Sequence, residues 1–429
     1  MNTPKSSRLP GFFRRTLHER IALAAEWAGL SADEAATLTT GGLTPAQADT
    51  MIENVIGLYA LPMGVAANFT INGRDVLVPM VIEEPSVLAA VSNAARLFRA
   101  GGGFQTSSDE PVMIGQIQVL DVPDAQAALI ALRREEAVLI ESANQGGGGI
   151  QRAGGGARGI EARLLPDTPA GPMLIVHLLY DTRDAMGANA INTAVERLAP
   201  EIEAITGGRV NLRILSNLAD QRKARAWGVI PHAELATDDR TGPEVVQSIL
   251  EAWAFAAADP YRAATHNKGV MNGIDALVMA TGNDWRAVEA GAHAYAARNG
   301  RYTSLTRYWQ DERGDLCAEI ELPLALGVVG GATRVHPTAR IALKILGNPS
   351  ARELAEIAAA VGLAQNLAAI RALAVEGIQH GHMRMHARQI AMAAGAAPDQ
   401  VAAVAQQMID EQQIRPERAR AIVEGLKGQ

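Results

Sequence analysis

The sequence has little of several features that mark particular classes of protein. It holds a single cysteine, Cys317, which excludes an intrachain disulfide and fits a reducing compartment. Its formal net charge of −7 argues against general nucleic-acid binding, because neutralising phosphates requires a concentrated excess of Lys and Arg. No apolar run reaches the roughly 18 residues that span a bilayer, and segment 1–15 lacks the apolar stretch of an export signal. We therefore expect a soluble, cytoplasmic protein with no nucleic-acid or membrane partner.

The sequence does have a globular composition over a length too great for one core. Of its 429 residues, 48% are hydrophobic and 20% are charged, so the chain can bury a large apolar surface. Chains of this length divide into domains. We expect a large mixed domain of helices and strands formed by residues 1–110 and 217–376, an inserted small domain at 111–216, and a C-terminal helical unit at 377–429.

The inserted segment has the clearest pattern of elements. The pattern predicts helices at 124–144 and 188–205 and strands at 113–122, 160–165, 173–180 and 210–215. Their order, β-α-β-β-α-β, is that of a ferredoxin-like domain. The predicted fold class is therefore α+β, with a ferredoxin-like small domain inserted into the large one.

The pattern of the large domain is less regular. It predicts helices at 17–29, 44–55 and 86–100, a strand at 68–81, and further helices at 242–257, 284–297 and 351–361. The triplet of glycines at 101–103 marks a boundary before the inserted domain.

Two glycine-containing segments are candidates for a dinucleotide site. Gly154, Gly156 and Gly159 match G-x-G-x-x-G, but the tract is so rich in glycine that the match has little weight, and a strand follows it. Segment 184–189 is better placed, because it follows an apolar strand and opens a helix whose N–H groups can hold a pyrophosphate. The alternative is an ordinary strand-to-helix turn with a capping side chain.

Three further positions carry residue types that suit acid–base chemistry. Glu83 and Glu84 end an apolar run before a helix, where a partly desolvated carboxyl group suits a proton donor, although acids there also favour the helix dipole. Lys268 closes a polar cluster and either faces a developing oxyanion or lies in a solvated turn. Asp284 is either a helix N-cap or a partner for Lys268, and the spacing leaves both open.

Three of the nine histidines lie within residues 380–386. His382 and His386 are four residues apart and would share a helical face, which is also the spacing of a zinc pair. No glutamate follows His382 as in H-E-x-x-H, and the cysteine is far away in the sequence. We therefore expect no metal.

Along nearly the whole chain and in the same order, these clusters resemble the class II, or bacterial, hydroxymethylglutaryl-CoA (HMG-CoA) reductases. The stretches that carry the resemblance are 51–57 (MIENVIG), 72–75 (NGRD), 83–86 (EEPS), 184–189 (DAMGAN), 261–269 (YRAATHNKG), 271–273 (MNG), 281–285 (TGNDW) and 381–383 (GHM). So many ordered matches are specific. The resemblance implies an NAD(P)-dependent enzyme that interconverts HMG-CoA with mevalonate and CoA by two hydride transfers.

The resemblance also implies roles for individual residues. The catalytic set is Glu83, Lys268, Asp284 and His382. The dinucleotide contacts are Asp184, Met186, Gly187, Ala188, Asn189 and Asn217, and the substrate contacts are Ser86, Arg262 and Asn272. In this scheme Lys268, oriented by Asp284, stabilises the oxyanion. Glu83 donates a proton to the carbonyl oxygen, and His382 protonates the departing CoA thiolate.

The same resemblance implies an assembly and a cofactor. The family's site lies between two subunits, so a homodimer is the expected active unit and a trimer of dimers the larger assembly. Residues 377–429 are expected to form a flap that brings His382 over the site. NAD(H) is the cofactor that the resemblance favours. NADP(H) is the alternative, because segment 145–149 lacks the acid that NAD-preferring relatives carry after an Ala-Asn pair matching Ala143 and Asn144, where it would repel a 2′-phosphate.

Two other functions fit less of the sequence. An acyl-CoA reductase with covalent cysteine catalysis would require Cys317 as nucleophile, but its alternating surroundings indicate a buried position in a strand. A non-catalytic relative that binds CoA ligands would have lost the catalytic residues, all of which are present.

Overall fold

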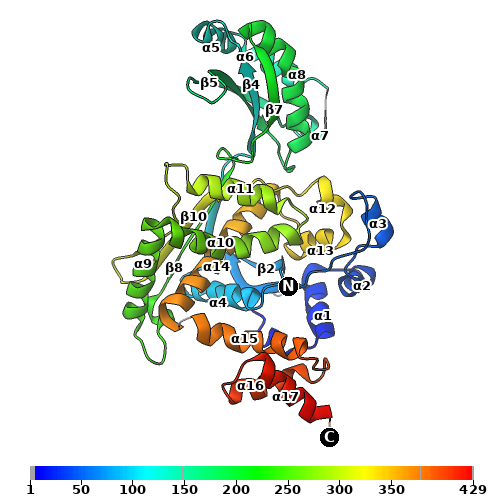
Figure 1. Cartoon of the computed structure of the whole chain (residues 1–429), viewed down its shortest axis with the longest axis vertical. Coiled ribbons are helices and arrows are strands. Elements are labelled where there is room, and N and C mark those ends of the chain that lie inside the picture. Colours follow the sequence, from blue (N-terminus) through cyan, green and yellow to red (C-terminus); the bar gives the residue numbers. More distant parts are fainter. Residues whose placement is uncertain (1–4, 147, 377, 428–429) are drawn as a thin grey trace.

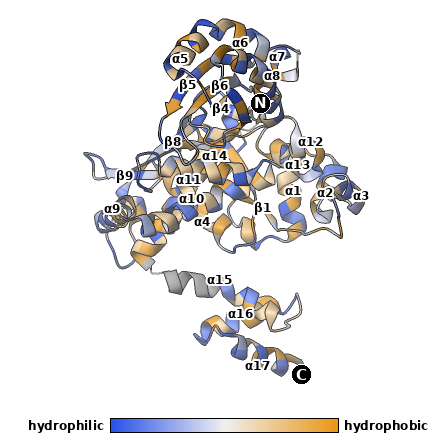
Figure 2. Ribbon diagram, turned by 45° about the horizontal axis from the view of Figure 1, so that its top comes forward, coloured by the Kyte–Doolittle hydropathy of each residue, from blue (hydrophilic) through white to orange (hydrophobic). Residues whose placement is uncertain are grey.

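The computed structural model describes residues 5–146, 148–376 and 378–427, and their side chains except those of 376–385 and 427. The chain forms three parts along its longest axis (Figure 1). A small α/β domain lies at one end, a large domain in the middle, and three C-terminal helices at the other end. The small domain and the C-terminal helices are at opposite ends in Figure 2 as well.

The N-terminal part of the large domain is helical. Its elements are η1 (Phe12–Arg14), α1 (Leu17–Ala28), α2 (Ala32–Thr40) and α3 (Pro45–Asp49). Capping boxes begin α1, α2 and α3, so the sequence fixes where these helices start. The helix predicted at 44–55 is wrong beyond Asp49, because residues 50–62 form neither helix nor strand. Apolar side chains there, such as Ile56, are exposed, so a helix would have no face to bury within this chain.

A two-stranded hairpin follows. β1 (Met63–Ile71) pairs antiparallel with β2 (Arg74–Val81), and the turn between them has positive φ angles at Asn72 and Gly73, as a tight hairpin requires. The strand predicted at 68–81 therefore contains a turn and parts of two strands. The helix α4 (Val87–Ala100) packs on β1 and ends close to its predicted bound.

The core of the large domain lies between a four-stranded sheet and the helix α14 (Ala351–Arg371). The sheet has the order β3 (Gln105–Ser108), β8 (Lys223–Ile230), β10 (Leu316–Pro323), β9 (Thr306–Gln310). α14 packs against three of these strands and against α4 and α10. Because it is surrounded in this way, apolar residues lie on most of its faces. The stretch Ala351–Val375 is long and apolar enough to cross a membrane by length and composition, but 67% of its most apolar window is buried inside the protein.

The other helices of the large domain surround this core. They are η2 (His232–Leu235), α9 (Gly242–Ala258), α10 (Pro260–Ala280), α11 (Trp285–Ala296), α12 (Gly331–Val335) and α13 (Pro337–Ile345). From the sequence alone, segment 259–269 could be either a solvated turn or part of a functional site. In the structure it forms the N-terminal cap and the first half of α10. Asp259 caps the first turn, Pro260 occupies the first helical position, and the later residues Val270, Ile274 and Leu277 are buried.

The predicted ferredoxin-like small domain is confirmed. Its antiparallel sheet has the order β5 (Gly156–Leu165), β6 (Met173–Asp181), β4 (Val112–Leu120), β7 (Arg209–Leu215). Its helices are α5 (Ala125–Arg134), α6 (Glu136–Ala143), α7 (Gly149–Arg152) and α8 (Ala188–Thr206). The single helix predicted at 124–144 is divided at Glu135, where ψ is 6°. The domain has its own apolar core between the sheet and α5, α6 and α8.

The C-terminal unit is helical, as the sequence predicts. A π-helical turn, η3 (Ala372–Glu376), continues α14 and leads to α15 (Ile378–Ala393), α16 (Val401–Asp410) and α17 (Pro416–Lys427). These three helices share a small core of their own around Val404, Met408 and Ile422.

Candidate active site

The first cavity, of about 410 Å³, lies between α4, α10 and α14. α10 supplies more of its polar side chains than any other element. Arg262, His266, Gly269 and Asn272 follow one another at spacings of three or four residues and so share one face of the helix, and Lys268 lines the cavity beside them.

An ion pair in this cavity joins two residues that are far apart in sequence. Lys268 Nζ lies 2.8 Å from Glu84 Oε2, and Asn272 Nδ2 donates to the same oxygen at 3.3 Å. This geometry corrects the choice of Glu83, whose side chain is exposed, whereas Glu84 is half-buried and lines the cavity. Both glutamates lie in the bend between β2 and α4, and there the chain turns the side chain of Glu84 towards α10.

Three side chains that line this cavity carry a buried polar atom without a hydrogen-bond partner among the described residues. The atoms are Ser86 Oγ, His266 Nδ1 and Gln365 Oε1. Buried polar groups are nearly always paired, so this concentration indicates a cavity built for a polar ligand. Ser86 is also in a conformation that is rare for a non-glycine residue, with φ of 79°, and such conformations cluster at functional sites.

Two of these residues, His266 and Gln365, were not identified as site residues from the sequence. Gln365 interrupts the apolar run of α14, and a polar residue within an otherwise buried apolar helix was the available signal. His266 lies inside the polar stretch that ends at Lys268, but no spacing distinguished it from its neighbours. Only the packing of α10 against α14 brings the two side chains to one cavity.

Arg262 places a positive charge at the same cavity. Burial lowers its pKa from the ordinary value for arginine, and in the described part of the chain no carboxylate pairs with it. A guanidinium group presents a planar pair of N–H donors that matches a carboxylate. The cavity can therefore hold an acid group at Arg262 and a second polar group at the Glu84–Lys268 pair.

The second cavity, of about 500 Å³, lies where the small and large domains meet. Four residues predicted to bind a dinucleotide, Met186, Gly187, Ala188 and Asn189, line it at the start of α8. Opposite them lie Gly282 to Asp284 and the glycine-containing segment 327–333, which includes the start of α12. N–H groups at the start of a long helix, with glycines rather than side chains facing them, suit a pyrophosphate.

Glycine is required at the start of α8. Gly187 has φ of 96°, and a Cβ there would lie 2.2 Å from Thr182 Cγ2. Likewise, a Cβ on Gly327 would lie 2.6 Å from the backbone nitrogen of Met186. The close backbone approach explains why this wall of the cavity carries few side chains.

Two other residues predicted at the cofactor site lie outside the lining of this cavity. Asp184 instead accepts a hydrogen bond from the backbone N–H of Ala351, at 2.8 Å, and so joins the loop that precedes α8 to the start of α14. Asn217 is exposed and lies beyond the cavity. Asp184 thus supports the loop rather than the ligand directly.

Asp284 lines the second cavity and does not contact Lys268 within one chain. Its carboxylate caps α11, accepting from the N–H groups of Arg286 and Ala287, and pairs with the Arg286 side chain at 3.3 Å. Lys268 and Ala280 are 12 positions apart in α10, which corresponds to about 18 Å along the helix. α10 therefore separates the two cavities, with Lys268 at one and Asp284 near the other.

The predicted His382 belongs to α15, but its side chain lies outside the described residues. His386, on the same helix, makes a hydrogen bond to Gln389. In the part of the chain that the structure describes, no group of three or more His, Cys, Asp or Glu residues could hold a metal ion.

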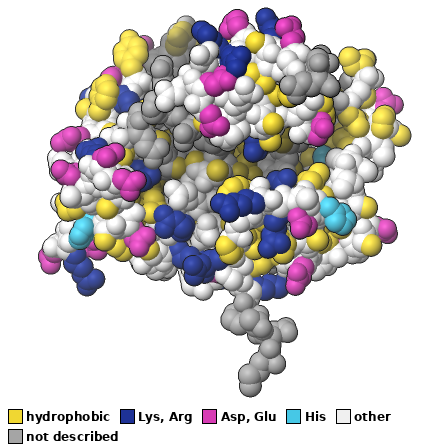
Figure 3. All heavy atoms as spheres, turned by 90° about the horizontal axis from the view of Figure 1, so that it is seen from below, with side chains coloured by type: hydrophobic (Ala, Val, Ile, Leu, Met, Phe, Trp, Pro, Cys, Tyr) yellow, Lys and Arg dark blue, Asp and Glu magenta, His cyan; other side chains and the backbone are white. Residues whose placement is uncertain are grey.

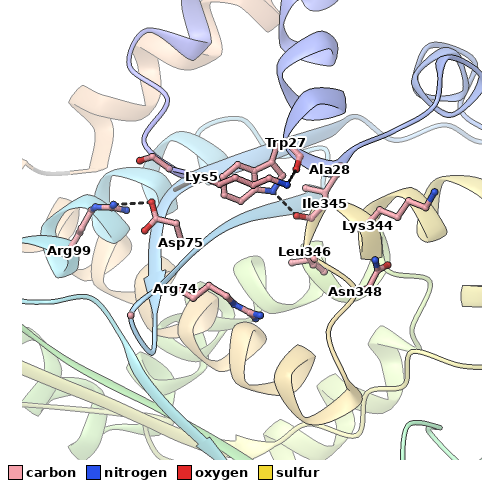
Figure 4. A pocket seen from close by; sticks show the side chains of 13 residues that line it. Lys5, Trp27, Ala28, Arg74, Asp75, Arg99, Lys344, Ile345, Leu346 and Asn348 are labelled. Atoms are coloured by element: carbon pink, nitrogen blue, oxygen red, sulfur yellow. Dashed lines mark hydrogen bonds and ion pairs between the residues drawn. The ribbon is translucent and has the colours of Figure 1, made fainter. Parts of the chain in front are cut away.

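A third cavity, of about 820 Å³, lies elsewhere, at the start of β2 (Figure 4). Its charged side chains have partners within the described chain. Arg99 pairs with Asp75 at 2.9 Å, and Lys5 donates to the carbonyl of Trp27. Lys344 and Arg74 pair with glutamates of α2 and α14. Despite its size, this cavity therefore offers no charged group that needs a ligand as its partner, among the residues that the structure describes.

The fold and the two cavities define an enzyme that brings an anionic substrate together with a phosphate-bearing cofactor. The family model of hydroxymethylglutaryl-coenzyme A reductase matches residues 16–387. The 3-hydroxy-3-methylglutaryl-coenzyme A reductase of Archaeoglobus fulgidus is 54% identical over 98% of this chain and 95% of its own. The probable reductase of Borreliella burgdorferi is 34% identical over 79% and 77%.

Solved structures agree. A class II reductase from Streptococcus pneumoniae, bound to NADPH in open conformations, matches with a TM-score of 0.82 and 41% identity, over 85% of this chain and 99% of that one. A second structure of that enzyme matches with a TM-score of 0.83 over 97% of this chain and 99% of that one, at 40% identity. This chain belongs to the hydroxymethylglutaryl-coenzyme A reductase family.

Proposed function

We propose that this chain catalyses the interconversion of HMG-CoA with mevalonate and CoA, using a nicotinamide cofactor. The observation that carries the proposal is the Glu84–Lys268 pair in a cavity that also holds the cation Arg262, which has no carboxylate partner among the described residues. The HMG group has a carboxylate at one end and a thioester carbonyl at the other. Arg262 suits the first, and the Glu84–Lys268 pair suits the second.

The substrate contacts follow from the unsatisfied groups. Arg262 binds the carboxylate of the HMG group through its planar fork. Ser86, Asn272 and Gln365 line the same cavity and offer hydrogen bonds to the carboxylate and hydroxyl groups. The face of the molecule seen in Figure 3 is hollowed near its centre, and Lys and Arg side chains gather around the hollow, which favours the approach of a polyanion such as CoA.

The proton chemistry is assigned to the ion pair and to the C-terminal helices. The Lys268 ammonium group stabilises negative charge on the thioester oxygen, and Glu84 passes the proton that neutralises it. The CoA thiolate then leaves, and its ordinary pKa of about 8.5 makes an imidazole a suitable proton donor. We assign that donor to His382, carried by α15.

The second cavity holds the cofactor in this proposal. When bound there, NAD(P)H supplies the hydride for each of the two reductions. Met186, Gly187 and Ala188, which line this cavity at the start of α8, would hold its pyrophosphate through their backbone N–H groups. Segment 145–149 contains no acid that would repel a 2′-phosphate, so NADP(H) is accepted alongside NAD(H). Comparing NADH with NADPH in one assay decides which the chain prefers.

We further propose that the working site is shared between two subunits. Within one chain, α10 keeps Lys268 and Asp284 on separate cavities, whereas hydride transfer requires substrate and cofactor in contact. The segment 51–59 exposes five large apolar side chains, at Met51, Ile52, Ile56, Leu58 and Tyr59. Such a patch marks a protein interface. We assign it to a second copy of this chain, so that Lys268 meets Asp284 of the partner subunit.

The larger assembly and the location are separate expectations. A trimer of such dimers, and a place in the cytoplasm, are predictions from the family resemblance and from the single cysteine. Sedimentation analysis measures the first directly.

The function is tested by following absorbance at 340 nm with purified protein, HMG-CoA and each reduced cofactor. We expect oxidation that depends on HMG-CoA, and the reverse signal with mevalonate, CoA and oxidised cofactor. The competing covalent mechanism would need Cys317, which is buried in β10 with its pKa raised by burial and lines neither cavity. Unchanged turnover in Cys317→Ala, with no turnover in Glu84→Gln, separates the two mechanisms.

A further inference from the structure

His266 is held in a buried hydrogen-bond network beside the substrate cavity. Its side chain is 2% exposed and lines the cavity. Its Nε2 lies 2.7 Å from Thr306 Oγ1, and Thr306 Oγ1 lies 3.1 Å from Asn366 Oδ1. Its other ring nitrogen, Nδ1, is buried and has no hydrogen-bond partner among the described residues.

The network assigns the position of the imidazole proton. Asn366 Nδ2 donates to the backbone carbonyl of His266 at 3.0 Å, which fixes the orientation of the amide and leaves Oδ1 as an acceptor. The Tyr308 hydroxyl also donates to that oxygen, at 2.9 Å. The Thr306 hydroxyl has one proton and gives it to Asn366 Oδ1, so it must accept from His266. His266 therefore carries its proton on Nε2 and presents a bare lone pair on Nδ1.

The imidazole stays neutral in this setting. Burial, followed by the nearby charge of Arg262, lowers its pKa to about 3. A neutral ring in this tautomer can only accept a hydrogen bond at Nδ1. A carboxylate or a carbonyl oxygen cannot supply one.

The HMG group has a single hydrogen-bond donor. Its carboxylate and thioester carbonyl only accept, and its 3-hydroxyl group alone can donate. We propose that His266 is a specificity-determining residue, whose Nδ1 accepts a hydrogen bond from the 3-hydroxyl group of the substrate. The inference rests on the proposed function, and it separates the duties of the cavity: Arg262 reads the carboxylate and His266 reads the hydroxyl.

The hydroxyl group is present in HMG-CoA and in mevalonate, so the contact can persist through both reductions. A ligand with hydrogen at this carbon would leave Nδ1 buried without a partner. An unmade hydrogen bond to a buried acceptor is more costly than the net value of a made one. The site should therefore discriminate against 3-methylglutaryl-CoA, which differs from HMG-CoA only by that hydroxyl group.

Two variants of His266 separate its two nitrogens. Asn has a polar atom at the same number of bonds from Cβ as Nδ1, whereas Gln has one at the same number of bonds as Nε2. His266→Asn can therefore keep an acceptor for the substrate and lose the bond to Thr306. His266→Gln can keep the bond to Thr306 and lose the acceptor. A third variant, Thr306→Val, leaves His266 intact but removes the acceptor that fixes its tautomer.

The test is calorimetric titration of each dimeric, cofactor-free variant with HMG-CoA and with 3-methylglutaryl-CoA, alongside its Tm. We expect the wild-type protein to bind HMG-CoA about tenfold more tightly than the analogue. His266→Gln and Thr306→Val should lose most of this preference. His266→Asn should retain it while its Tm falls, because its bond to Thr306 is gone.

A preference that is unchanged in His266→Gln, or lost equally in His266→Asn, would overturn the assignment and leave His266 with a packing role. If the His266 variants gave such a result but the wild-type protein turned over HMG-CoA, only the role of His266 would be contradicted and the proposed function would be unaffected. Wild-type protein that bound neither thioester would contradict the proposed function itself.

Discussion

Lys268 Nζ lies 2.8 Å from Glu84 Oε2, and this ion pair connects α10 with the segment that follows β2. Both groups are partly exposed, with side-chain exposures of 59% and 31%, so the pair adds little to stability. Its value lies in placing a cation and a proton-carrying group together in a cavity that can admit a ligand. The pair is therefore best explained by chemistry rather than by folding.

The neighbouring glutamates supply a matched pair of variants. We expect Glu84→Gln to lower kcat by at least about a hundredfold, because it removes a positioned proton-transfer group. Glu83→Gln changes an exposed side chain that lines neither cavity, and should keep kcat within about twofold of the wild-type value. Steady-state kinetics at 340 nm measure both. Equal losses in the two variants, or a loss only in Glu83→Gln, would reverse the assignment.

A site shared between subunits predicts complementation. Lys268→Ala and Asp284→Ala should each be nearly inactive as homodimers. In a mixed dimer, one site carries both substitutions and the other carries neither. Co-expression at equal levels should therefore restore about a quarter of wild-type activity, since about half of the dimers are mixed and each has one intact site. Activity that stays at the level of the single variants would indicate a site within one chain.

Arg222 links the loop at 182–186, which precedes α8, to the large domain. Its buried guanidinium group donates to Thr182 Oγ1 and to the carbonyls of Ala185 and Leu326, and burial lowers its pKa to about 10, so it stays charged at neutral pH. Arg222→Met should lower the free energy of unfolding by about 3–5 kcal/mol, because it leaves buried acceptors unpaired.

The same variant should raise KM for the cofactor more than KM for HMG-CoA, because the loop at 182–186 borders the second cavity. Arg209→Met removes an exposed ion pair with Asp121 and is the control, with an expected change within about 0.5 kcal/mol. Denaturant unfolding and two-substrate kinetics measure these effects. An unchanged KM for the cofactor in Arg222→Met would show that this residue does not support cofactor binding.

Asp275 predicts a pH dependence of stability. Burial and the neighbouring Glu289 raise its pKa to about 9, while Glu289 is held ionised by His293. In the unfolded chain an aspartate loses its proton near pH 4. Between about pH 4 and pH 9 the folded state therefore binds more protons than the unfolded state, and this group lowers stability as pH rises.

The variant Asp275→Asn cannot ionise and should lack this loss. We expect the Tm difference between variant and wild type to shift in favour of the variant from pH 5 to pH 9. Thermal unfolding at several pH values measures it. A difference that is constant with pH would show that Asp275 is already ionised in the folded protein.

Much of the architecture could be predicted from local patterns. The alternation of strands and helices at 112–216 predicted the ferredoxin-like domain. At the start of α8 the local pattern left a dinucleotide site and an ordinary turn both open, and the structure shows that residues 186–189 line a cavity there. The errors have a common physical cause. Where the outcome depended on tertiary packing, as for the turn-like start of α10 or the helix expected beyond Asp49, local propensity gave no decision.

The site shows the same division. The two glutamates at 83–84 indicated a proton donor. Which of the two carboxylates faces α10 is set by the direction of the chain after β2, and the sequence does not report that direction. Gln365 becomes visible only when α14 is packed against α10. The proposed contact between Lys268 and Asp284 of the partner subunit would depend on the packing of two chains, and no pattern within one sequence reports such packing.

The most direct test of the proposed function is the stoichiometry of the overall reaction. With limiting HMG-CoA and excess reduced cofactor, absorbance at 340 nm and product analysis give the number of cofactor molecules oxidised per thioester consumed. A two-step reduction in one site predicts two cofactor molecules oxidised for each mevalonate and each free CoA formed. One cofactor molecule per thioester with release of the free aldehyde, or no oxidation that depends on HMG-CoA with either cofactor, would contradict the proposed function.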